Sequence, residues 1–504
     1  MIIFIVGIIP ILQVDGNNSL SLKYSTYLGG NGTEGHGFLN FDNSSNCLLI
    51  SNTDSTNFPM KNAIQETNNG ERDAICLKLD TKAEDILYST YYGGSGDDFV
   101  SGTTLDSQGN MIIVGATSSL DFPLENAIID TRISHEREIF AFKLSSDGQN
   151  VIFSTYLGSA SDYYSIDVTT DSDDNIIITG STSASDFLVK NAYQENKSGG
   201  VDAFITKITQ DGQNVIFSTY FGGTNDDQIK RVNTDKDDNI IAIGVTSSKE
   251  QFPLKSSLRP NKSTSSWDVF LVKFSSDGQE LIFSTFYGGT RPWGPAAIIC
   301  DSNNNIIAAG ETDSQEFPIV NAFQRDYGGG DLDSFLSKIS PNGQEIGFST
   351  FIGGTGSEGP IGITIDSKDN IFLTGSTNSN DFTLKNAFQT NNNGGWDGYV
   401  LEFSNDGQDL LFSTYFGGRS SDYSTSIALI PETNNSFLLT GHGDSIDLPL
   451  VNPYQEWYGG GEFDLFLSRF DYVDDTNQKS TPGFELSFIL GLVVVYLLKK
   501  RRLE

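Results

Sequence analysis

A triplet of Ser, Thr and an aromatic residue returns seven times along this 504-residue chain, and each interval holds four strand-like segments. Together these two observations predict an all-β ring, a seven-bladed β-propeller. Successive triplets are 64, 65, 64, 66, 65 and 64 residues apart. A spacing this constant indicates one repeated structural unit. The triplets begin at Ser25, Ser89, Ser154, Ser218, Ser284, Ser349 and Ser413.

The repeat that starts at Gly158 shows the four segments in order. SIDVTTD alternates in polarity, IIITGST is rich in β-branched residues, AFITKI follows a long connection, and VIFSTYFGG ends the unit. Clusters such as DSDDN separate the first two segments, and dipeptides such as Asp211-Gly212 separate the last two. These are turn sequences of tight hairpins, so we expect four antiparallel strands, a to d, in each blade.

The two ends of the chain predict how the ring closes. The chain begins with a lone d segment, Leu22–Gly30, whereas the last repeat ends after its c segment, Asp464–Phe470. The N-terminal strand is therefore expected to complete the last blade, which removes two open sheet edges. The predicted propeller spans residues 21–471.

The segments outside the ring predict export and anchoring. Residues 1–16 form an apolar run of signal-peptide length, without a basic n-region or an A-x-A cleavage site. After the ring come a polar linker (472–483), an apolar stretch (484–498) and a basic tail (499–504). The apolar stretch is shorter than the ~20 residues that span a bilayer comfortably. The terminal cations predict a cytoplasmic tail, with the ring on the extracellular face of the membrane.

Composition restricts the partners and the cysteine chemistry. Acidic residues outnumber basic residues by 65 to 31, so the net charge is −34 and nucleic acid is not an expected partner. Three cysteines are too few for a disulfide framework, and their spacing matches no metal site. Buried thiols are expected, and a Cys47–Cys76 bridge stays open as an alternative.

Two stretches carry a resemblance to a known repeat. DSQGNMIIVGATSSLDFPLENA and DAFITKITQDGQNVIFSTYFGG resemble the SBBP repeat of seven-bladed β-propellers, and the resemblance covers roughly Ser21 to Phe470. It implies the fold, but such repeats occur in many surface and secreted proteins without a common activity. The tail with Pro482-Gly483-Phe484 resembles the PGF-type sorting signals of archaeal surface proteins, which implies removal of the tail and a lipid anchor. A plain single-pass anchor is the alternative.

Loop lengths predict which face of the ring binds. Strands alternate in direction, so the short a–b and c–d turns share one face and the long b–c and d–a connections share the other, which we call the long-loop face. Binding residues usually lie on loops held by a rigid scaffold. We expect the residues just after each Gly-Gly pair to surround the mouth of the central channel. These candidates are Glu34, Asp97, Asp98, Asp162, Tyr163, Asp226, Asp227, Arg291, Trp293, Glu358 and Asp422.

Two interpretations of these residues stand at this stage. As a ligand site, the carboxylates would bind Ca²⁺ or sugar hydroxyls and the aromatic rings would stack on sugars. As parts of the scaffold, they would accept backbone N–H groups within loops copied from repeat to repeat. Arg291 and Trp293 depart from the repeated pattern, so copying does not explain them. Apart from Ca²⁺, no cofactor is indicated.

Two other repeated features are expected to be structural. The Lys that recurs in strand c, as at Lys78 and Lys143, is expected to pair between blades or to extend its charge to solvent. The NAxQ sequence of the long b–c connection, as at Asn191–Gln194, is expected to start one helical turn.

The sequence favours a non-catalytic binding or adhesion module at the cell surface. Its partner would be a surface protein, a glycan or a matrix component, and the C-terminal segment would contact the membrane. Sequence motifs of Ser hydrolases, zinc proteases and phosphate-binding loops are absent. A lyase or glycoside hydrolase that uses channel-mouth carboxylates is the competing class, because retaining glycosidases need two carboxylates ~5–5.5 Å apart. A structural component of the envelope is the third.

Overall fold

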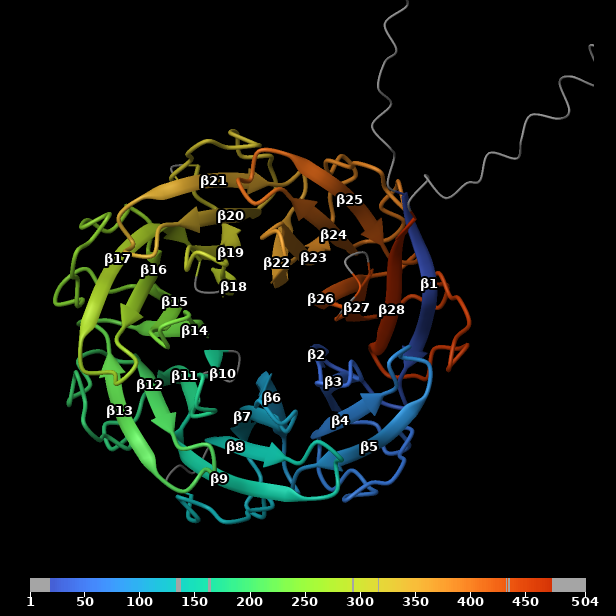
Figure 1. The fold of residues 1–504 in the computed structure, drawn as a ribbon, viewed down its shortest axis with the longest axis horizontal. Coiled ribbons are helices and arrows are strands. Elements are labelled where there is room, and N and C mark those ends of the chain that lie inside the picture. Colours follow the sequence, from blue (N-terminus) through green and yellow to red (C-terminus); the bar gives the residue numbers. More distant parts are fainter. Residues whose placement is uncertain are drawn as a thin grey trace, which may run out of the picture.

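The chain forms a ring of seven four-stranded antiparallel sheets around a central axis (Figure 1). This computed structural model describes residues 19–473, apart from 133–136, 162–164, 292–293, 316, 432 and 434–435. In each sheet the strand order runs from the inner strand a to the outer strand d. The predicted all-β, seven-bladed fold is confirmed.

The first four blades follow the chain in order. Blade 1 comprises β2 (Phe38–Phe41), β3 (Cys47–Thr53), β4 (Asp73–Leu79) and β5 (Ile86–Tyr92). Blade 2 comprises β6 (Asp98–Leu105), β7 (Met111–Thr117), β8 (Glu138–Leu144) and β9 (Val151–Ser159). Blade 3 comprises β10 (Asp167–Thr170), β11 (Ile176–Thr182), β12 (Asp202–Ile208) and β13 (Val215–Phe221). Blade 4 comprises β14 (Asp227–Thr234), β15 (Ile240–Thr246), β16 (Trp267–Phe274) and β17 (Leu281–Thr290).

The remaining blades complete the circle. Blade 5 comprises β18 (Pro295–Cys300), β19 (Ile306–Thr312), β20 (Asp333–Ile339) and β21 (Ile346–Ile352). Blade 6 comprises β22 (Glu358–Ile365), β23 (Ile371–Thr377), β24 (Asp397–Phe403) and β25 (Leu410–Phe416). Blade 7 comprises β26 (Asp422–Leu429), β27 (Ser436–Gly443) and β28 (Asp464–Val473), with β1 (Ser19–Leu28) as its outer strand.

The ring closes as the sequence predicts. The first strand, β1, pairs antiparallel with the last, β28, so that Ser25 lies opposite Ser468 and Leu28 opposite Leu465. The Ser25 and Ser468 hydroxyls are 2.9 Å apart. Figure 1 shows the blue N-terminal strand beside the red C-terminal one. Unfolding of either end would therefore open blade 7.

The hydrophobic core lies between neighbouring blades. At the junction of blades 7 and 1, Tyr24, Leu28 and Leu465 of blade 7 belong to one buried cluster with Leu49 and Leu77 of blade 1. Burying a side chain of this size stabilises a fold by about 1.5–3 kcal/mol. Each blade alternates its apolar side chains between two such junctions, which explains why the blades pack face to face.

The Ser of the repeated triplet binds the b–c connection to the outer strand of each blade. In blade 1, Ser89 of β5 exchanges two backbone hydrogen bonds with Lys61, which lies in the connection between β3 and β4. The same bridge recurs at the Ser of all seven triplets. The long b–c connection thus wraps onto strand d and blunts an edge that would otherwise be free to pair with another chain.

The Thr and the aromatic residue of the triplet fasten the same connection. The Thr90 hydroxyl accepts the backbone N–H of Gln65 at 3.0 Å. The buried Tyr91 hydroxyl donates to the carbonyl of Ser55 at 2.9 Å and accepts the N–H of Phe58 at 3.0 Å. The repeated letters therefore encode how the connection docks on strand d.

The NAxQ sequence forms no helical turn, which corrects the prediction. The Asn that begins this sequence has a left-handed backbone conformation. It follows the residue that bridges to strand d, and the chain turns there instead of starting a helix. Asn is one of the residues that adopts this region most readily. The φ values lie between 44° and 51° at Asn62, Asn126, Asn191, Ser256, Asn321, Asn386 and Asn452. The carbonyl of Asn62 then accepts the side-chain amide of Gln149 from blade 2 at 2.8 Å, which links neighbouring blades.

Lys residues of strand c join the blades on the face with the short turns. The Lys143 ammonium group lies 2.7 Å from Asp106 of the a–b turn in its own blade and donates to the carbonyl of Gln210 in blade 3 at 2.9 Å. The predicted pairing between blades is therefore confirmed. The ion pair between the strand-c Lys and the a–b turn of its own blade recurs at 2.6–2.7 Å in Lys78–Asp42, Lys207–Asp171, Lys273–Asp235 and Lys338–Asp301.

The segments predicted to direct export and anchoring, 1–16, 484–498 and 499–504, lie outside the described residues, and so does the predicted linker (472–483) beyond Val473, where β28 ends. Across the described part of the chain, no helix has the length and apolar character needed to cross a bilayer. Cys47 and Cys76 are free and buried, so the alternative of a bridge between them is excluded.

Candidate functional site

Five of the predicted carboxylates point into the blades; four of them begin an inner strand, and Glu34 stands four residues before β2. Each accepts the backbone N–H of the second Gly of the preceding Gly-Gly pair, as Asp98 does from Gly94 at 2.6 Å. None has an exposed fraction above 1%. The five residues are Glu34, Asp98, Asp227, Glu358 and Asp422. The five carboxylates therefore lie at the junctions between blades, and not at the channel mouth where the sequence predicted them. Their role as ligands for Ca²⁺ or a sugar stays a prediction.

Hydroxyl groups at the end of strand b hold the same carboxylates. Asp98 accepts hydrogen bonds from Thr117 and, at 2.8 Å, from Ser119. Glu358 accepts from Thr377 at 2.6 Å and from Ser379. These contacts satisfy much of each carboxylate within the scaffold, as the scaffold interpretation of the sequence expects.

The other candidates lie nearer the solvent. Asp97 is half-buried between two guanidinium groups, with Arg72 at 3.9 Å and Arg137 at 3.5 Å. Asp226 accepts the backbone N–H of Val201 at 3.0 Å. Arg291 pairs with Asp313 at 3.2 Å. The remaining candidates, Asp162, Tyr163 and Trp293, lie outside the described residues.

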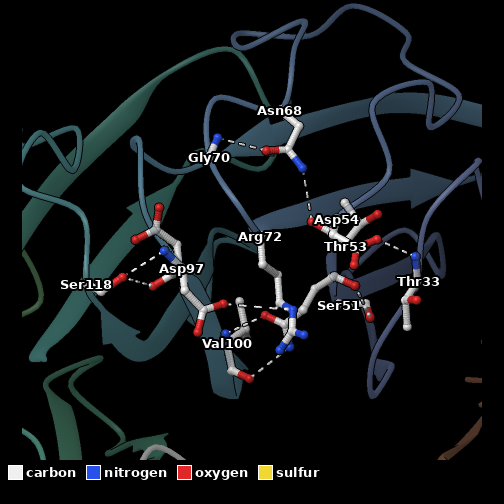
Figure 2. A network of polar contacts seen from close by, with 12 residues as sticks. Thr33, Ser51, Thr53, Asp54, Asn68, Gly70, Arg72, Asp97, Val100 and Ser118 are labelled. Carbon is white, nitrogen blue, oxygen red and sulfur yellow. Dashed lines mark hydrogen bonds and ion pairs between the residues drawn. The ribbon is translucent and has the colours of Figure 1, made fainter. Parts of the chain in front are cut away.

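Figure 2 shows how blades 1 and 2 meet at this face. The Arg72 side chain lies between Asp97 and the start of β6, and its guanidinium carbon is 5.7 Å from the centre of the Phe99 ring. The backbone of Val100 is held by the side-chain amide of Asn52 at the end of β3. The backbone N–H of Asp97 donates to the Ser118 hydroxyl at 2.8 Å, and this hydroxyl donates to the Asp97 carbonyl at 3.4 Å. This network fixes the first residues of an inner strand against the neighbouring blade.

A cavity of about 370 Å³ opens where the inner strands begin. Its lining comes from the inner strands or the residues just before them in blades 1, 2, 4, 5, 6 and 7, with Glu311 from β19. Because these strands surround the axis in Figure 1, the cavity is the long-loop end of the central channel. We call it the channel pocket.

Bulges in the inner strands shape the channel pocket. The pairing of strands a and b skips one residue in blades 2, 4, 5, 6 and 7, as between Val100 and Gly102. A β-bulge leaves its extra residue unpaired and re-aims its side chain. The extra residues are Ser101, Lys230, Ala296, Ile361 and Thr425, and all five line the channel pocket. They differ in size, charge and polarity, although the surrounding scaffold repeats.

The sequence analysis missed this ring of five residues. Each stands seven positions after the second Gly of its repeat, three positions beyond the buried carboxylates. The available signal was variation: the residue type at this position differs from repeat to repeat, whereas the surrounding positions are similar. The sequence pattern of a strand does not show a bulge, so only the structure shows which way these side chains point.

Charged groups line the channel pocket from blades 4 and 5. Arg231 of β14 lines it, and Asp167 of β10 faces Arg231 and accepts the N–H of Val232 at 2.9 Å. Burial raises the pKa of Glu311 to about 7, while Arg291 opposes this shift. Lys230 is 4% exposed. The pocket thus offers cationic donors in a chain that is strongly acidic overall.

Four aromatic rings lead from the rim of the long-loop face to the channel pocket. Trp396 stacks on Tyr423 at 6.2 Å between ring centres, Tyr423 on His442 at 5.3 Å, and His442 on His36 at 5.0 Å. His36 lines the pocket. Burial, with a smaller effect of Arg231, lowers the pKa of His36 to about 4, so the imidazole is neutral at pH 7. We call these four residues the ring stack.

Comparisons with known proteins support the fold and leave the ligand open. A family model described as the SBBP β-propeller repeat matches residues 348–383. No curated protein matches the sequence.

Three solved structures are similar to this chain at low identity and low TM-score. A protein of unknown function from Dyadobacter fermentans has a TM-score of 0.40 and 10% identity, over 90% of this chain and all of its own. A quinohemoprotein alcohol dehydrogenase from Pseudomonas putida has 0.40 and 8%, over 92% and 78%. BamB from Moraxella catarrhalis has 0.37 and 10%, over 90% and 99%. Likeness at this level says nothing about what this chain binds.

Proposed function

We propose that this protein is a non-catalytic binding module that takes its ligand in the channel pocket of the long-loop face. The observation that carries the proposal is the ring of five bulge residues. A repeat copies its scaffold, so a position that differs in each of the five bulged blades and faces one shared cavity is where binding specificity would reside. Bulges are frequent at sites where a side chain must be re-aimed.

A glycan is the ligand that the pocket fits best. The ring stack ends in the pocket at His36, whose ring would contact a bound sugar. Arg231 and the Thr425 hydroxyl line the same cavity and would bind sugar hydroxyl or carboxylate groups. A volume of about 370 Å³ is within the range of small-ligand sites.

Hydrolysis is less well supported than binding. Among the described lining residues, Glu311 is the one carboxyl group, whereas the common glycosidase mechanisms use two. The buried carboxylates described above, such as Asp98, lie inside the blade junctions, where a substrate cannot reach them. The pocket therefore has groups that bind and orient, without a described pair of acid and base.

The proposed setting is the extracellular face of the cell membrane. The apolar segments at 1–16 and 484–498 motivate this proposal, with export through the first and anchoring through the second. The partner would then be an envelope or matrix glycan, or a surface protein that carries one.

A binding screen of the purified protein tests the proposed function. The probes are a glycan array and a panel of envelope proteins, each with calcium chloride and with EDTA. For any probe that binds, Ile361→Ser and Arg231→Gln should weaken binding at least tenfold, because both side chains line the pocket. If binding requires calcium, the result would support the predicted role of the loop carboxylates as Ca²⁺ ligands.

Matched substitutions outside the pocket serve as controls. Ile446→Ser and Arg325→Gln change exposed side chains of b–c connections and should leave binding unchanged. Thermal unfolding of each variant checks that it is folded. Equal binding by pocket variants and controls would contradict the proposed site. If no probe binds and deletion of the gene alters only envelope integrity, the protein is a structural component instead.

A further inference from the structure

Two buried carboxyl groups meet at five of the seven blade junctions. One begins strand c, and the other is the buried carboxylate at or just before the start of strand a of the next blade. At the junction of blades 1 and 2, an oxygen of Asp73 and one of Asp98 lie 2.5 Å and 2.7 Å from the point where a Cβ on Gly93 would stand. The five pairs are Asp464–Glu34, Asp73–Asp98, Asp202–Asp227, Asp333–Glu358 and Asp397–Asp422.

The pair that closes the ring shows the geometry most clearly. Glu34 Oε1 accepts the hydroxyls of Thr53 at 2.7 Å and Ser55 at 2.6 Å, whereas Glu34 Oε2 is buried without a partner. Asp464 accepts the backbone N–H groups of Gly459 and Gly460. Two adjacent carboxylates with an unsatisfied oxygen would be costly to bury, but a proton on Glu34 Oε2 would convert that oxygen into a donor toward Asp464.

The ten carboxyl groups take part in no described ion pair with Lys, Arg or His. Burial raises the pKa of Asp202 and outweighs the lowering effect of Lys197. Burial is the main effect on their acidity. It raises the pKa of Glu34 to about 8, with the nearby Asp464 adding to the shift, and it raises the pKa of Asp464 to about 6. Burial also raises the pKa of Asp227 and of Asp422 to about 7.

We propose that each of these five junctions holds one proton shared between its two carboxyl groups, and that the Glu34–Asp464 pair is a pH-sensitive latch on ring closure. When the proton leaves, two negative charges face each other in a buried site, and blades 7 and 1 are held less firmly. The latch is independent of the proposed ligand site, because neither residue lines the channel pocket.

Other ionisable groups near this pair do not titrate over the same pH range. Burial raises the pKa of Tyr27 of β1 to about 12, and it raises the pKa of Tyr91 of β5 and of Tyr458 before β28. All three phenols stay neutral between pH 5 and 9. The acids that influence these phenols, apart from the paired carboxyls themselves, are the exposed Asp444, Asp447 and Glu462. Burial lowers the pKa of His36, two residues from Glu34, and of its neighbour His442, so both affect stability only below about pH 7. Above pH 7 the pair itself is the expected source of a change at this junction.

The two exceptional junctions explain an irregularity of the sequence. At the position of the second carboxylate, blade 3 has Tyr163 and blade 5 has Trp293. In blade 4, the acid that begins strand c, Asp268, is instead 3.5 Å from the Lys262 ammonium group. At the blade 4–5 junction the second acid is absent, and Asp268 lies in a described ion pair. This junction is a natural control.

Equilibrium unfolding between pH 7 and 9 tests the shared proton. A carboxyl group whose pKa is higher in the folded state stabilises the fold fully below its ordinary pKa, and this stability is lost as pH rises through the folded value. The unfolding constant of the natural protein should therefore rise more than tenfold from pH 7 to pH 9. Glu34→Gln should reduce this rise at least threefold, because its amide donates to Asp464 at every pH.

Asp268→Asn is the matched control and should leave the alkaline change as in the natural protein. Asp464→Asn is the second latch variant, in case Glu34→Gln does not fold. An unfolding constant that stays level between pH 7 and 9, or one that rises equally in the natural protein and both latch variants, would overturn the proposal.

Thiol labelling locates the opening. Cys47 lies in the cluster shared by blades 7 and 1, whereas Cys76 lies in the cluster shared by blades 1 and 2. At pH 8.5, labelling followed by mass spectrometry should modify Cys47 at least threefold faster in the natural protein than in Glu34→Gln, with Cys76 unchanged. Equal labelling of Cys47 in both proteins would contradict the latch.

Discussion

The two faces of the ring hold their buried carboxylates in opposite ways. On the short-turn face of blades 1 to 5, the first Asp of the a–b turn is paired with a Lys of strand c, as Asp106 is with Lys143 at 2.7 Å. On the long-loop face, each acid of a pair meets another acid, as Asp73 meets Asp98 around Gly93. The same residue type is therefore ionised on one face and, by our proposal, partly protonated on the other.

The difference shows that the partner decides what a buried acid does for stability. Burial raises the pKa of Asp106, but hydrogen bonds from Lys143 and Asn110 outweigh it and hold the pKa below its ordinary value. No cation offsets burial at Asp73, and its pKa rises to about 7. One face is thus sensitive to acid and the other to alkali, and the ring should be most stable between these limits.

The largest effect is expected when a cation is removed from the short-turn face. Lys143→Met leaves Asp106 buried and unpaired, since their side chains are 5% and 0% exposed. Breaking a buried pair in this way costs about 3–5 kcal/mol, measured as the free energy of unfolding in urea at pH 7. Lys255→Met removes an exposed pair, with side chains 44% and 69% exposed, and should cost about 0.5 kcal/mol or less. Equal losses would show that the buried pair has no special weight.

A smaller effect is expected when the long-loop face is crowded. Gly93→Ala places a methyl group 2.5 Å from Asp73 and 2.7 Å from Asp98, so the carboxyl pair must separate. Overpacking of this kind costs about 1–3 kcal/mol, again read from urea unfolding. Gly359→Ala is the control, because the nearest atom to its methyl group would be 3.6 Å away. A neutral result at Gly93 would mean that the pair is more loosely packed than described.

The smallest effect per site is expected in acid. The Asp residues of the a–b turns have pKa values below the ordinary range, so they stabilise the fold above about pH 4 and this stability is lost as pH falls further. Thermal unfolding between pH 2 and 5 should show a falling midpoint. Lys143→Met should show a shallower fall, because the Asp106 carboxylate has lost its cation. A midpoint that rises steadily toward pH 2 would contradict the comparison.

Much of the scaffold could be predicted from the sequence because its signals are local. Turn dipeptides such as Asp211-Gly212 identify hairpins, and the lone d segment at Leu22–Gly30 identifies the closing strand. The recurrence of the strand-c Lys suggested pairing between blades or extension of its charge to solvent, and the structure shows the contact between blades. Hydrophobic alternation and turn chemistry act over a few residues, so they can be read without knowing the neighbours.

The candidate site could be predicted only in part. The choice of the long-loop face agrees with the channel pocket, but the residues that line it stand beyond those expected. Asp98 was predicted at the mouth and lies in the junction, whereas Ser101 was overlooked and lies in the pocket. A bulge shifts the alternation of a strand by one residue, and nothing in the local sequence marks it.

By itself, the sequence determined the number of blades, the strands of each blade and the way the ring closes, because each depends on a pattern repeated within about 65 residues. The tertiary structure alone decided which side chains meet. Glu34 and Asp464 stand at opposite ends of the chain and face each other only because the ring closes. Whether a buried acid meets a cation, another acid or an open channel depends on the neighbouring blade, and local propensity carries no information about that neighbour.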